Sequence, residues 1–244
     1  MKKTFLTLSL FLTATITFAQ DKGFVSVNFG SSIPIGEFAS TDENSNSAGY
    51  AQTGFLVDVS LGLKFSKHFG VNMLVREQVN KYDAQALADQ TKESGVSSSI
   101  NTTAWTMGGY MVGCYGSFPI SKIFTIEPRI MVGYSTATSP NITINVTDGT
   151  TSAWAKVHSA SSGSFSYLIG VGYRINAGKS FCFSFNADYL GANPEFSNVV
   201  TTYSWGDKEV GTMSQNIETI NLSFGIGFRF GTQKNQKKLT INDL

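Results

Sequence analysis

Charged residues are scarce in this chain, and those present nearly cancel. Asp, Glu, Lys and Arg together make up 14% of the 244 residues, whereas soluble domains usually carry about 25%. The formal net charge is +1, so the sequence lacks the strongly basic balance that favours nucleic acid, and it indicates no acidic partner. We therefore expect neither a nucleic-acid partner nor the charged exterior of a soluble protein.

Cysteine and histidine are equally rare, with two of each. Cys114 and Cys182 fall in predicted strands that are not neighbours, so we interpret both as packing residues, because a disulfide needs Cα atoms within about 7 Å. His68 lies in a short predicted turn, and His158 lies in a long loop near several serines, without a carboxylate placed to assist it. The spacing typical of metal ligands is absent. We predict no catalytic residue, no metal site and no cofactor.

Beyond the N-terminus, the sequence has no apolar run of the roughly 20 residues that a membrane-spanning helix needs. The N-terminus itself has Lys2 and Lys3, a short apolar stretch, and small residues around Ala19. This pattern is typical of a secretory signal peptide. We predict that residues 1–19 are a cleaved signal peptide, and that the mature chain begins at Gln20 or Asp21.

What the chain has in abundance is the alternation of large apolar residues with small or polar ones. In the segment 221–230, for example, Leu222, Phe224 and Ile226 alternate with Ser223 and Gly225. A period of two indicates a β-strand with two different environments. Segments of this kind lie at residues 25–30, 55–65, 69–76, 105–118, 124–134, 165–175, 181–189 and 221–230. The facing of 105–118 is left open, because Tyr110 and Met111 compete for the outer face.

The connections alternate between short and long. Short ones lie at 66–68, 119–123 and 176–180, and long ones lie at 34–52, 81–100, 139–162 and 193–215. Short periplasmic turns with long extracellular loops are typical of outer-membrane barrels. We predict an all-β fold, an eight-stranded antiparallel up-and-down transmembrane β-barrel spanning 20–231, with 232–244 as a periplasmic tail. A soluble lipocalin-like barrel is the alternative, but its exterior would rarely be so poor in charge.

Two turn signals predict the strand register. Asp148-Gly149 places Phe124 opposite Tyr173, and Gly206-Asp207 places Phe183 opposite Phe230. Both alignments keep apolar residues on one face, as a correct register must. We therefore expect the third and fourth long loops to be hairpins that extend the barrel strands.

The small-residue face also carries most of the charges in the strands. An arginine facing lipid at mid-membrane costs about 2–4 kcal/mol, so this face is assigned to the lumen. Around the first short turn, Asp58 and Arg76 are expected to lie opposite each other and to form an ion pair. We predict a structural ion-pair network that fills the lumen, made of Asp58, Arg76, Glu127, Arg129, Arg174, Asp188 and Arg229. Lys64 lies on the same face of its strand but is not assigned to the network.

Several short motifs carry a resemblance to a known family. They are the signal ending Phe18-Ala19-Gln20, Ile33 to Phe38, Phe118-Pro-Ile-Ser121, Glu127-Pro-Arg129, and Gly225 to Phe230. Nearly all of the mature chain resembles the small outer-membrane β-barrel domain proteins widespread in Bacteroidota, which are porin-family-like and similar to OmpA-type barrels. The C-terminal strand, through Ser223, Gly225, Phe228 and Phe230, resembles the assembly signal read by the barrel assembly machinery.

The predicted function follows from these features. We expect a monomeric, non-enzymatic barrel in the cell outer membrane, in contact with its lipid, with surface-exposed loops, a side-chain-filled lumen and a structural role in envelope integrity. Eight-stranded barrels are normally filled by side chains, which favours this function over a small passive pore. A lipid A-modifying enzyme is the third possibility. The sequence names no ligand for the loops.

Overall fold

The computed structural model describes residues 23–42, 45, 47–93, 97–147, 151–178 and 180–231. The predicted signal peptide (1–19), the Asp148-Gly149 turn and the tail (232–244) lie outside the described residues.

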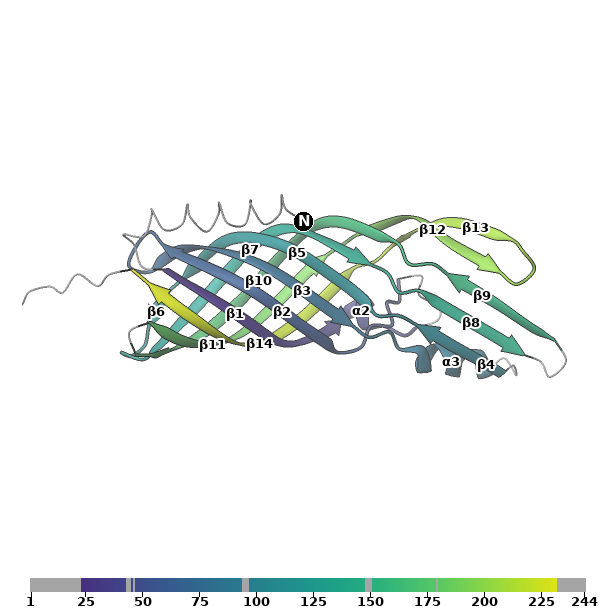
Figure 1. Cartoon of the computed structure of the whole chain (residues 1–244), viewed down its shortest axis with the longest axis horizontal. Coiled ribbons are helices and arrows are strands. Elements are labelled where there is room, and N and C mark those ends of the chain that lie inside the picture. Colours follow the sequence, from purple (N-terminus) through teal and green to yellow (C-terminus); the bar gives the residue numbers. More distant parts are fainter. Residues whose placement is uncertain are drawn as a thin grey trace, which may run out of the picture.

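Eight antiparallel strands form a closed barrel, as the sequence predicts. Its long strands are paired in the order β10, β11, β14, β1, β2, β3, β5 and β7, and β7 pairs with β10 to close the ring (Figure 1). The two-residue strand β6 (Phe118–Pro119) is appended to β7. The barrel strands are β1 (Gly23–Ile35), β2 (Gly54–Lys64), β3 (Phe69–Asn80), β5 (Trp105–Gly116), β7 (Phe124–Thr138), β10 (Ser161–Ala177), β11 (Phe181–Ala192) and β14 (Ile217–Phe230).

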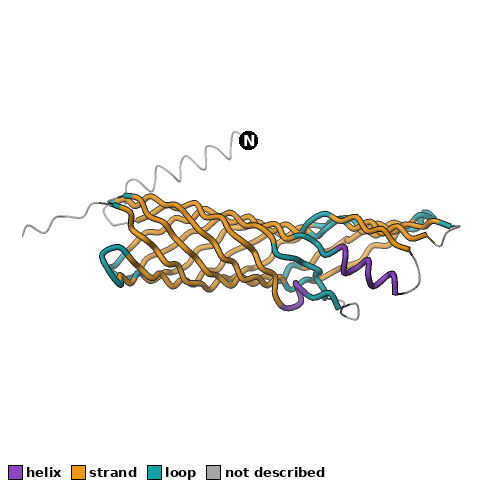
Figure 2. The backbone as a smooth tube through the Cα atoms, turned by 90° about the horizontal axis from the view of Figure 1, so that it is seen from below, coloured by secondary structure: helices purple, strands orange, loops and turns teal. Residues whose placement is uncertain are grey.

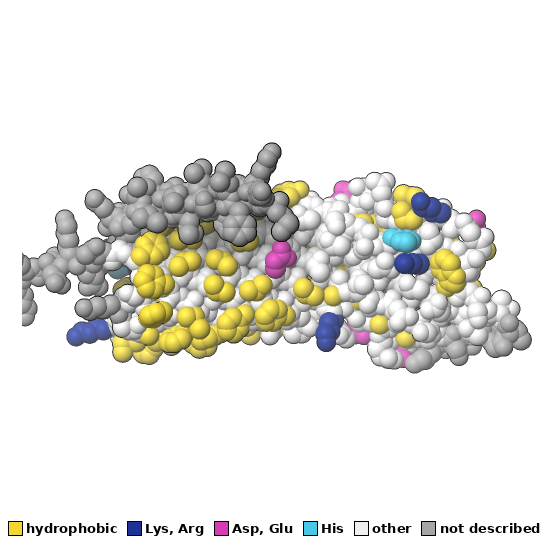
Figure 3. All heavy atoms as spheres, viewed as in Figure 1, with side chains coloured by type: hydrophobic (Ala, Val, Ile, Leu, Met, Phe, Trp, Pro, Cys, Tyr) yellow, Lys and Arg dark blue, Asp and Glu magenta, His cyan; other side chains and the backbone are white. Residues whose placement is uncertain are grey.

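The predicted alternation becomes two different surfaces of the barrel wall. Large apolar residues point outward and are exposed, for example Val27, Ile169 and Phe228, whereas Asn221 and Ser223 point inward and are buried. Figure 3 shows hydrophobic side chains gathered over the barrel strands, and fewer of them over the loops beyond. The wall therefore has an apolar belt outside and a largely polar lining inside.

The long loops form a second sheet beyond one end of the barrel. Its order is β13 (Lys208–Ser214), β12 (Glu195–Tyr203), β9 (Ser152–Val157), β8 (Ile142–Thr147) and β4 (Ser97–Thr102). Figure 2 shows it continuing one side of the barrel, with the helices α2 (Gly36–Ala39) and α3 (Ala84–Glu93) near the same end. The third and fourth loops are the hairpins that the sequence predicts, whereas β4 and α3 were not foreseen. Neither described helix is long and apolar enough to cross a membrane.

The predicted register of the third hairpin is wrong by two residues. Phe124 lies opposite Ile175, and Tyr173 lies opposite Ile126. The β8–β9 pairing ends with Thr147 opposite Ser152, so the connection is two residues longer than a tight Asp-Gly turn. An even shift keeps every residue on its predicted face. Phe124 and Tyr173 are diagonal neighbours whose rings stack with centroids 5.4 Å apart.

The predicted register of the fourth hairpin is wrong by four residues. Phe183 lies opposite Ile226, and Phe230 lies opposite Gly23 instead. The backbone N–H of Tyr203 donates to the carbonyl of Asp207, so the turn is centred earlier than Gly206-Asp207. An irregularity in β12 shifts the pairing by one more residue. The faces are again preserved, because the total shift is even.

The structure also settles the strand whose facing the sequence left open. Trp105, Met107 and Met111 point into the lumen, whereas Tyr110 points outward and is 65% exposed. Both cysteines are free: Cys114 is exposed on the outer face, and Cys182 is buried. The two do not form a disulfide, as expected, and the interpretation as a packing residue is confirmed for Cys182 but not for the exposed Cys114.

An apolar cluster runs from the middle of the lumen to the mouth at the long-loop end. At the mouth, Phe38 of α2 packs on Trp105 with ring centroids 5.6 Å apart, and Trp105 packs on Phe196 at 5.9 Å. The Trp105 Nε1–H donates to the carbonyl of Gly49, which ties the first loop to this end. This apolar lumen cluster comprises Phe38, Leu74, Trp105, Met107, Met111, Met131, Leu168, Leu190, Phe196 and Ile217, with Ala51, Ala137 and Ala192.

Candidate functional site

The middle of the lumen holds four charged side chains in mutual contact, here called the central cluster. Arg76 donates from Nη2 to Asp58 Oδ2 and to Asp188 Oδ2, at 2.9 Å in each case. Arg129 donates from Nε to Asp188 Oδ1 at 2.9 Å and from Nη2 to Asp188 Oδ2 at 2.7 Å. All four side chains are buried, and their charges cancel. Pairing of this kind offsets the high cost of removing each charge from water.

The predicted contact between Asp58 and Arg76 is present. The two residues lie opposite each other in the β2–β3 pairing. Arg76 also uses Nε, which is 3.3 Å from Asp58 Oδ2. The sequence could identify this pair because both residues belong to one hairpin with a very short turn.

The amide of Asn28 on β1 connects the central cluster to β11, two strands away in the barrel wall. Its Nδ2 donates to Asp58 Oδ1 at 2.6 Å, and its Oδ1 accepts from the Ser184 hydroxyl at 2.9 Å. Asn186 donates to the same Oδ1 at 3.4 Å and to Ser223 Oγ at 3.3 Å. Asn28 thus supplies a hydrogen bond that the buried Asp58 carboxylate requires, and Ser184 and Asn186 of β11 hold the Asn28 amide in place.

A second group, here called the lower cluster, lies nearer the short turns. Arg174 donates from Nε at 3.0 Å and from Nη2 at 2.6 Å to Glu127 Oε2. Its guanidinium carbon lies 3.4 Å from the centre of the Phe24 ring, a cation–π contact. Ser117 donates to Glu127 Oε1 at 3.4 Å and accepts from Lys64 Nζ at 2.6 Å. The lower cluster therefore combines an ion pair with an aromatic face.

Arg229 occupies a different position from the other predicted network residues. It is half-buried at the rim, and its Nη2 donates to the backbone carbonyl of Gly178 at 2.7 Å. The buried charged residues of the described chain are three acids and three arginines, so the enclosed charge sums to zero: Asp58, Glu127, Asp188, Arg76, Arg129 and Arg174.

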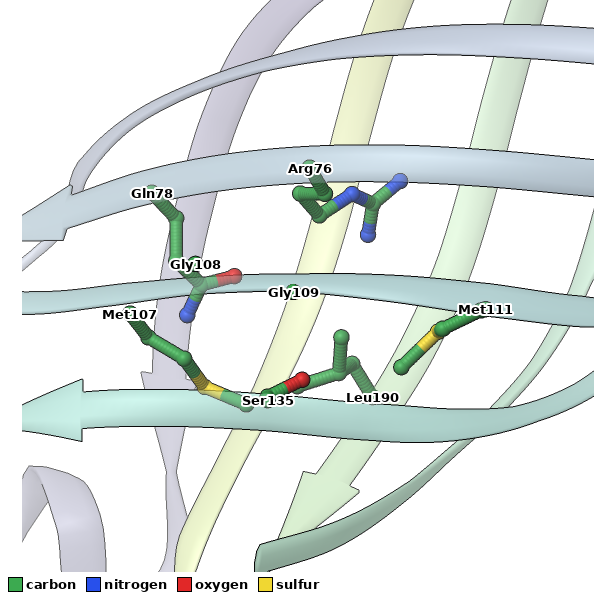
Figure 4. A pocket seen from close by; sticks show the side chains of 8 residues that line it. All are labelled: Arg76, Gln78, Met107, Gly108, Gly109, Met111, Ser135 and Leu190. Atoms are coloured by element: carbon green, nitrogen blue, oxygen red, sulfur yellow. The ribbon is translucent and has the colours of Figure 1, made fainter. Parts of the chain in front are cut away.

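Little space remains between these side chains. Two small cavities of about 10 Å³ lie in the lumen, one beside each cluster. Figure 4 shows the upper one, where Arg76 and Gln78 lie near Met107, Met111 and Leu190. A volume of this size corresponds to about one water molecule. Within the described residues, Arg76 Nη1 and both polar atoms of the Gln78 amide have no hydrogen-bond partner.

The two histidines lie away from these clusters. His68 stacks on Phe118 at 5.8 Å, and its Nδ1 lies 3.3 Å from the Ser117 carbonyl. His158 lies just after β9, with Nε2 3.3 Å from the Thr202 hydroxyl. Among the residues described, no group of three or more His, Cys, Asp or Glu side chains could hold a metal. In the part of the chain that the structure describes, neither histidine side chain has a carboxylate partner.

The predicted assembly-signal residues lie in β14, between β1 and β11. Phe228 is outward and exposed, Phe230 is half-buried beside Gly23, and Ser223 and Gly225 face the lumen. A Cβ on Gly225 would collide with the Asn28 amide oxygen and approach Ser184 Oγ to 2.6 Å. Packing inside the folded barrel therefore leaves no room for a side chain at position 225.

Sequence reasoning missed two parts of this lumen. It did not predict that Asp188 is shared by two arginines, because β7, β3 and β11 are not neighbouring strands. It also overlooked the apolar lumen cluster. Leu74, Met131 and Leu168 alternate in phase with the small residues that face the lumen. This position in the sequence could have predicted that large apolar side chains also fill the lumen.

Comparisons with known proteins agree with this architecture. A model of the family described as outer membrane protein beta-barrel domain matches residues 4–230. No curated protein matches the chain. Among solved structures, a major outer membrane protein from Thermus thermophilus is similar with a TM-score of 0.50 and 11% identity, covering 85% of this chain and 99% of that one.

Two further solved structures are similar at lower scores. OprG from Pseudomonas aeruginosa has a TM-score of 0.48 and 8% identity, covering 88% of this chain and 98% of its own. Ail from Yersinia pestis has a TM-score of 0.43 and 14% identity, covering 86% of this chain and 99% of its own. At these identities the likeness concerns the fold alone.

Proposed function

This chain belongs to the outer membrane protein beta-barrel domain family, which implies a place in the outer membrane, and we propose that it is a non-enzymatic structural barrel supporting envelope integrity. The long loops would be displayed outside the cell and the short turns in the periplasm. Export would use the cleaved signal peptide, and the barrel would be a monomer surrounded by lipid. The motifs quoted above support an origin among the Bacteroidota barrels.

The observation that carries this proposal is the filled lumen. The charge-balanced central cluster, the Glu127–Arg174 ion pair and the apolar lumen cluster occupy the interior, and the two cavities beside the charges are each about the size of one water. A filled barrel is rigid and presents its loops on a stable support. This arrangement supports a scaffold more than a passive pore, which needs a continuous water-filled path.

The alternative of a lipid A-modifying enzyme would place chemistry near His158. The imidazole of His158 forms its hydrogen bond with the hydroxyl of Thr202. General-base chemistry usually combines a histidine with an orienting carboxylate. The contacts therefore support the non-enzymatic function over the enzymatic one.

The C-terminal strand would serve biogenesis. We propose that Ser223, Gly225, Phe228 and Phe230 are read by the barrel assembly machinery while β14 is still unpaired. In the folded barrel both edges of β14 are covered, by β1 and by β11. The signal would therefore be accessible only before the barrel closes.

A deletion strain tests the envelope role. Loss of the protein is expected to increase sensitivity to detergent and uptake of an excluded dye, and the wild-type gene should restore both. His158→Ala should restore them equally well and leave the lipid A profile unchanged. A deletion strain with a normal envelope, or with altered lipid A that His158→Ala fails to restore, would contradict the proposal.

A further inference from the structure

The tip of the β12–β13 hairpin carries an aromatic pair, the half-buried Tyr203 and the exposed Trp205, that is firmly held. The Tyr203 and Trp205 rings stack with centroids 4.8 Å apart and planes 14° from parallel, while Trp205 remains 64% exposed. The indole Nε1–H donates to Asp207 Oδ2 at 2.7 Å, and the Tyr203 hydroxyl donates to Glu209 Oε2 at 2.8 Å. Each ring therefore has a carboxylate at its edge, and much of the indole surface remains open.

The backbone of the tip is also fixed. The Tyr203 N–H donates to the Asp207 carbonyl, and the Gly206 N–H donates to the Tyr203 carbonyl, both at 3.1 Å. The Ser204 N–H donates to the Trp154 carbonyl at 2.9 Å, which anchors the turn to β9. A surface that is ordered before binding loses less conformational entropy when a ligand arrives. The tip is thus preorganised.

Charges are segregated between the two faces of this sheet. Lys208 lies opposite Thr202, which lies opposite Lys156, so the two lysines share one face. Tyr203 and Glu209 are the next residues along each strand and point to the other face, because side chains alternate. Figure 3 shows Lys or Arg side chains and a histidine on the visible face of the loop extension, with acidic side chains at its edges. The aromatic pair therefore lies on the face that carries the carboxylates.

We propose that this aromatic–acidic platform, formed by Tyr203, Trp205, Asp207 and Glu209, binds a guanidinium group such as an arginine side chain presented outside the cell. A guanidinium group is planar, so it can stack on an aromatic face while its N–H groups, which point outward in its own plane, donate to carboxylates. Tryptophan is the best ring for such a cation–π contact. The hydrogen bond to Glu209 raises the pKa of the Tyr203 phenol, which keeps that ring neutral and its hydroxyl a donor.

Other ligand chemistries fit the platform less well. A quaternary ammonium group is best held by several aromatic walls, but these two rings stack on each other and form a single surface. A neutral sugar could stack on Trp205, yet it would gain nothing from the negative charge of the two carboxylates. The combination of a flat ring and acids at its edge is what selects a flat cation.

The full-length protein in lipid nanodiscs provides the test. Its three tryptophans give three indole Nε1–H signals in a proton–nitrogen NMR spectrum, and Trp205→Phe identifies one of them. N-acetyl-arginine amide should shift the Trp205 signal saturably and leave the signal of the buried Trp105 unchanged. N-acetyl-citrulline amide, which has the same shape without the charge, should bind at least about fivefold more weakly.

A matched pair of variants separates charge from fold. The double variant Asp207→Asn and Glu209→Gln keeps acceptor oxygens at the ring edges but removes both charges, and it should lower arginine affinity to the citrulline level. Lys208→Gln, on the opposite face, should not weaken binding. The proposal is overturned if citrulline binds as well as arginine, if methyl glucoside shifts Trp205 more, if the double variant binds normally, or if the signal does not move.

Discussion

Arg129 and Asp188 are joined by two hydrogen bonds across the lumen, although β10 separates their strands in the barrel wall. The distances are 2.9 and 2.7 Å, and both side chains are buried. Paired geometry of this kind combines charge with fixed orientation. Since Asp188 also accepts from Arg76, one carboxylate links β3, β7 and β11 through the interior.

Asp188→Asn is therefore expected to be strongly destabilising. The variant leaves two buried guanidinium groups without their shared counter-charge, at a cost of about 3–5 kcal/mol. Urea unfolding in micelles, followed by the mobility difference between folded and unfolded bands, measures this cost. Asp207→Asn is the matched control, because Asp207 is exposed in a hairpin turn, and it should unfold like the wild type.

The Asp58–Arg76 contact can be measured by a double-mutant cycle. Asp58→Ala and Arg76→Ala each leave the other charge buried without this partner, so the double variant should lose less stability than the sum of the single variants. We expect a coupling of more than about 1 kcal/mol. Strictly additive losses would mean that the two side chains do not interact.

Gly225→Ala should disturb the barrel interior. The added methyl group collides with Asn28, which itself holds Asp58, so we expect a loss of about 1–3 kcal/mol from overpacking. Gly211→Ala is the control, because a Cβ there meets no described atom within 4 Å. Equal unfolding curves for the two variants would show that Asn28 does not pack against Gly225 as described.

The apolar belt predicts a difference between two equally exposed positions. Ile169 on the barrel wall is 55% exposed, and Val210 in the loop sheet is 60% exposed. Ile169→Arg should cost about 2–4 kcal/mol if it faces the membrane interior, whereas Val210→Arg should cost little. Folding yield into phospholipid vesicles compares them. Similar yields would contradict the placement of the belt in the bilayer.

The faces of the strands were predictable because alternation is local. Each inward or outward assignment depends only on the neighbouring residues, so Asp58, Glu127 and Arg174 were placed in the lumen from sequence alone. The register was harder. Phe183 was paired with the wrong residue because a longer turn and a β12 irregularity lie far from it in the chain.

Contacts between non-neighbouring strands were beyond sequence reasoning. The meeting of Arg76, Arg129 and Asp188 depends on barrel curvature and on side-chain length, which no single hairpin encodes. The strand β4 was missed for a related reason: its partner β8 belongs to a different loop. Arg229 shares the lumen-facing parity of the network residues, yet its position near the end of β14 places it at the rim.

Conductance of the purified barrel in planar lipid bilayers tests the filled lumen most directly. Balanced buried charges and an apolar mouth should leave no continuous water path, so we expect no reproducible current steps from the wild-type protein. A well-characterised porin inserted under the same conditions shows that the assay detects channels. Stable wild-type channels that are changed or abolished by Arg129→Ala would contradict the filled lumen and establish a pore.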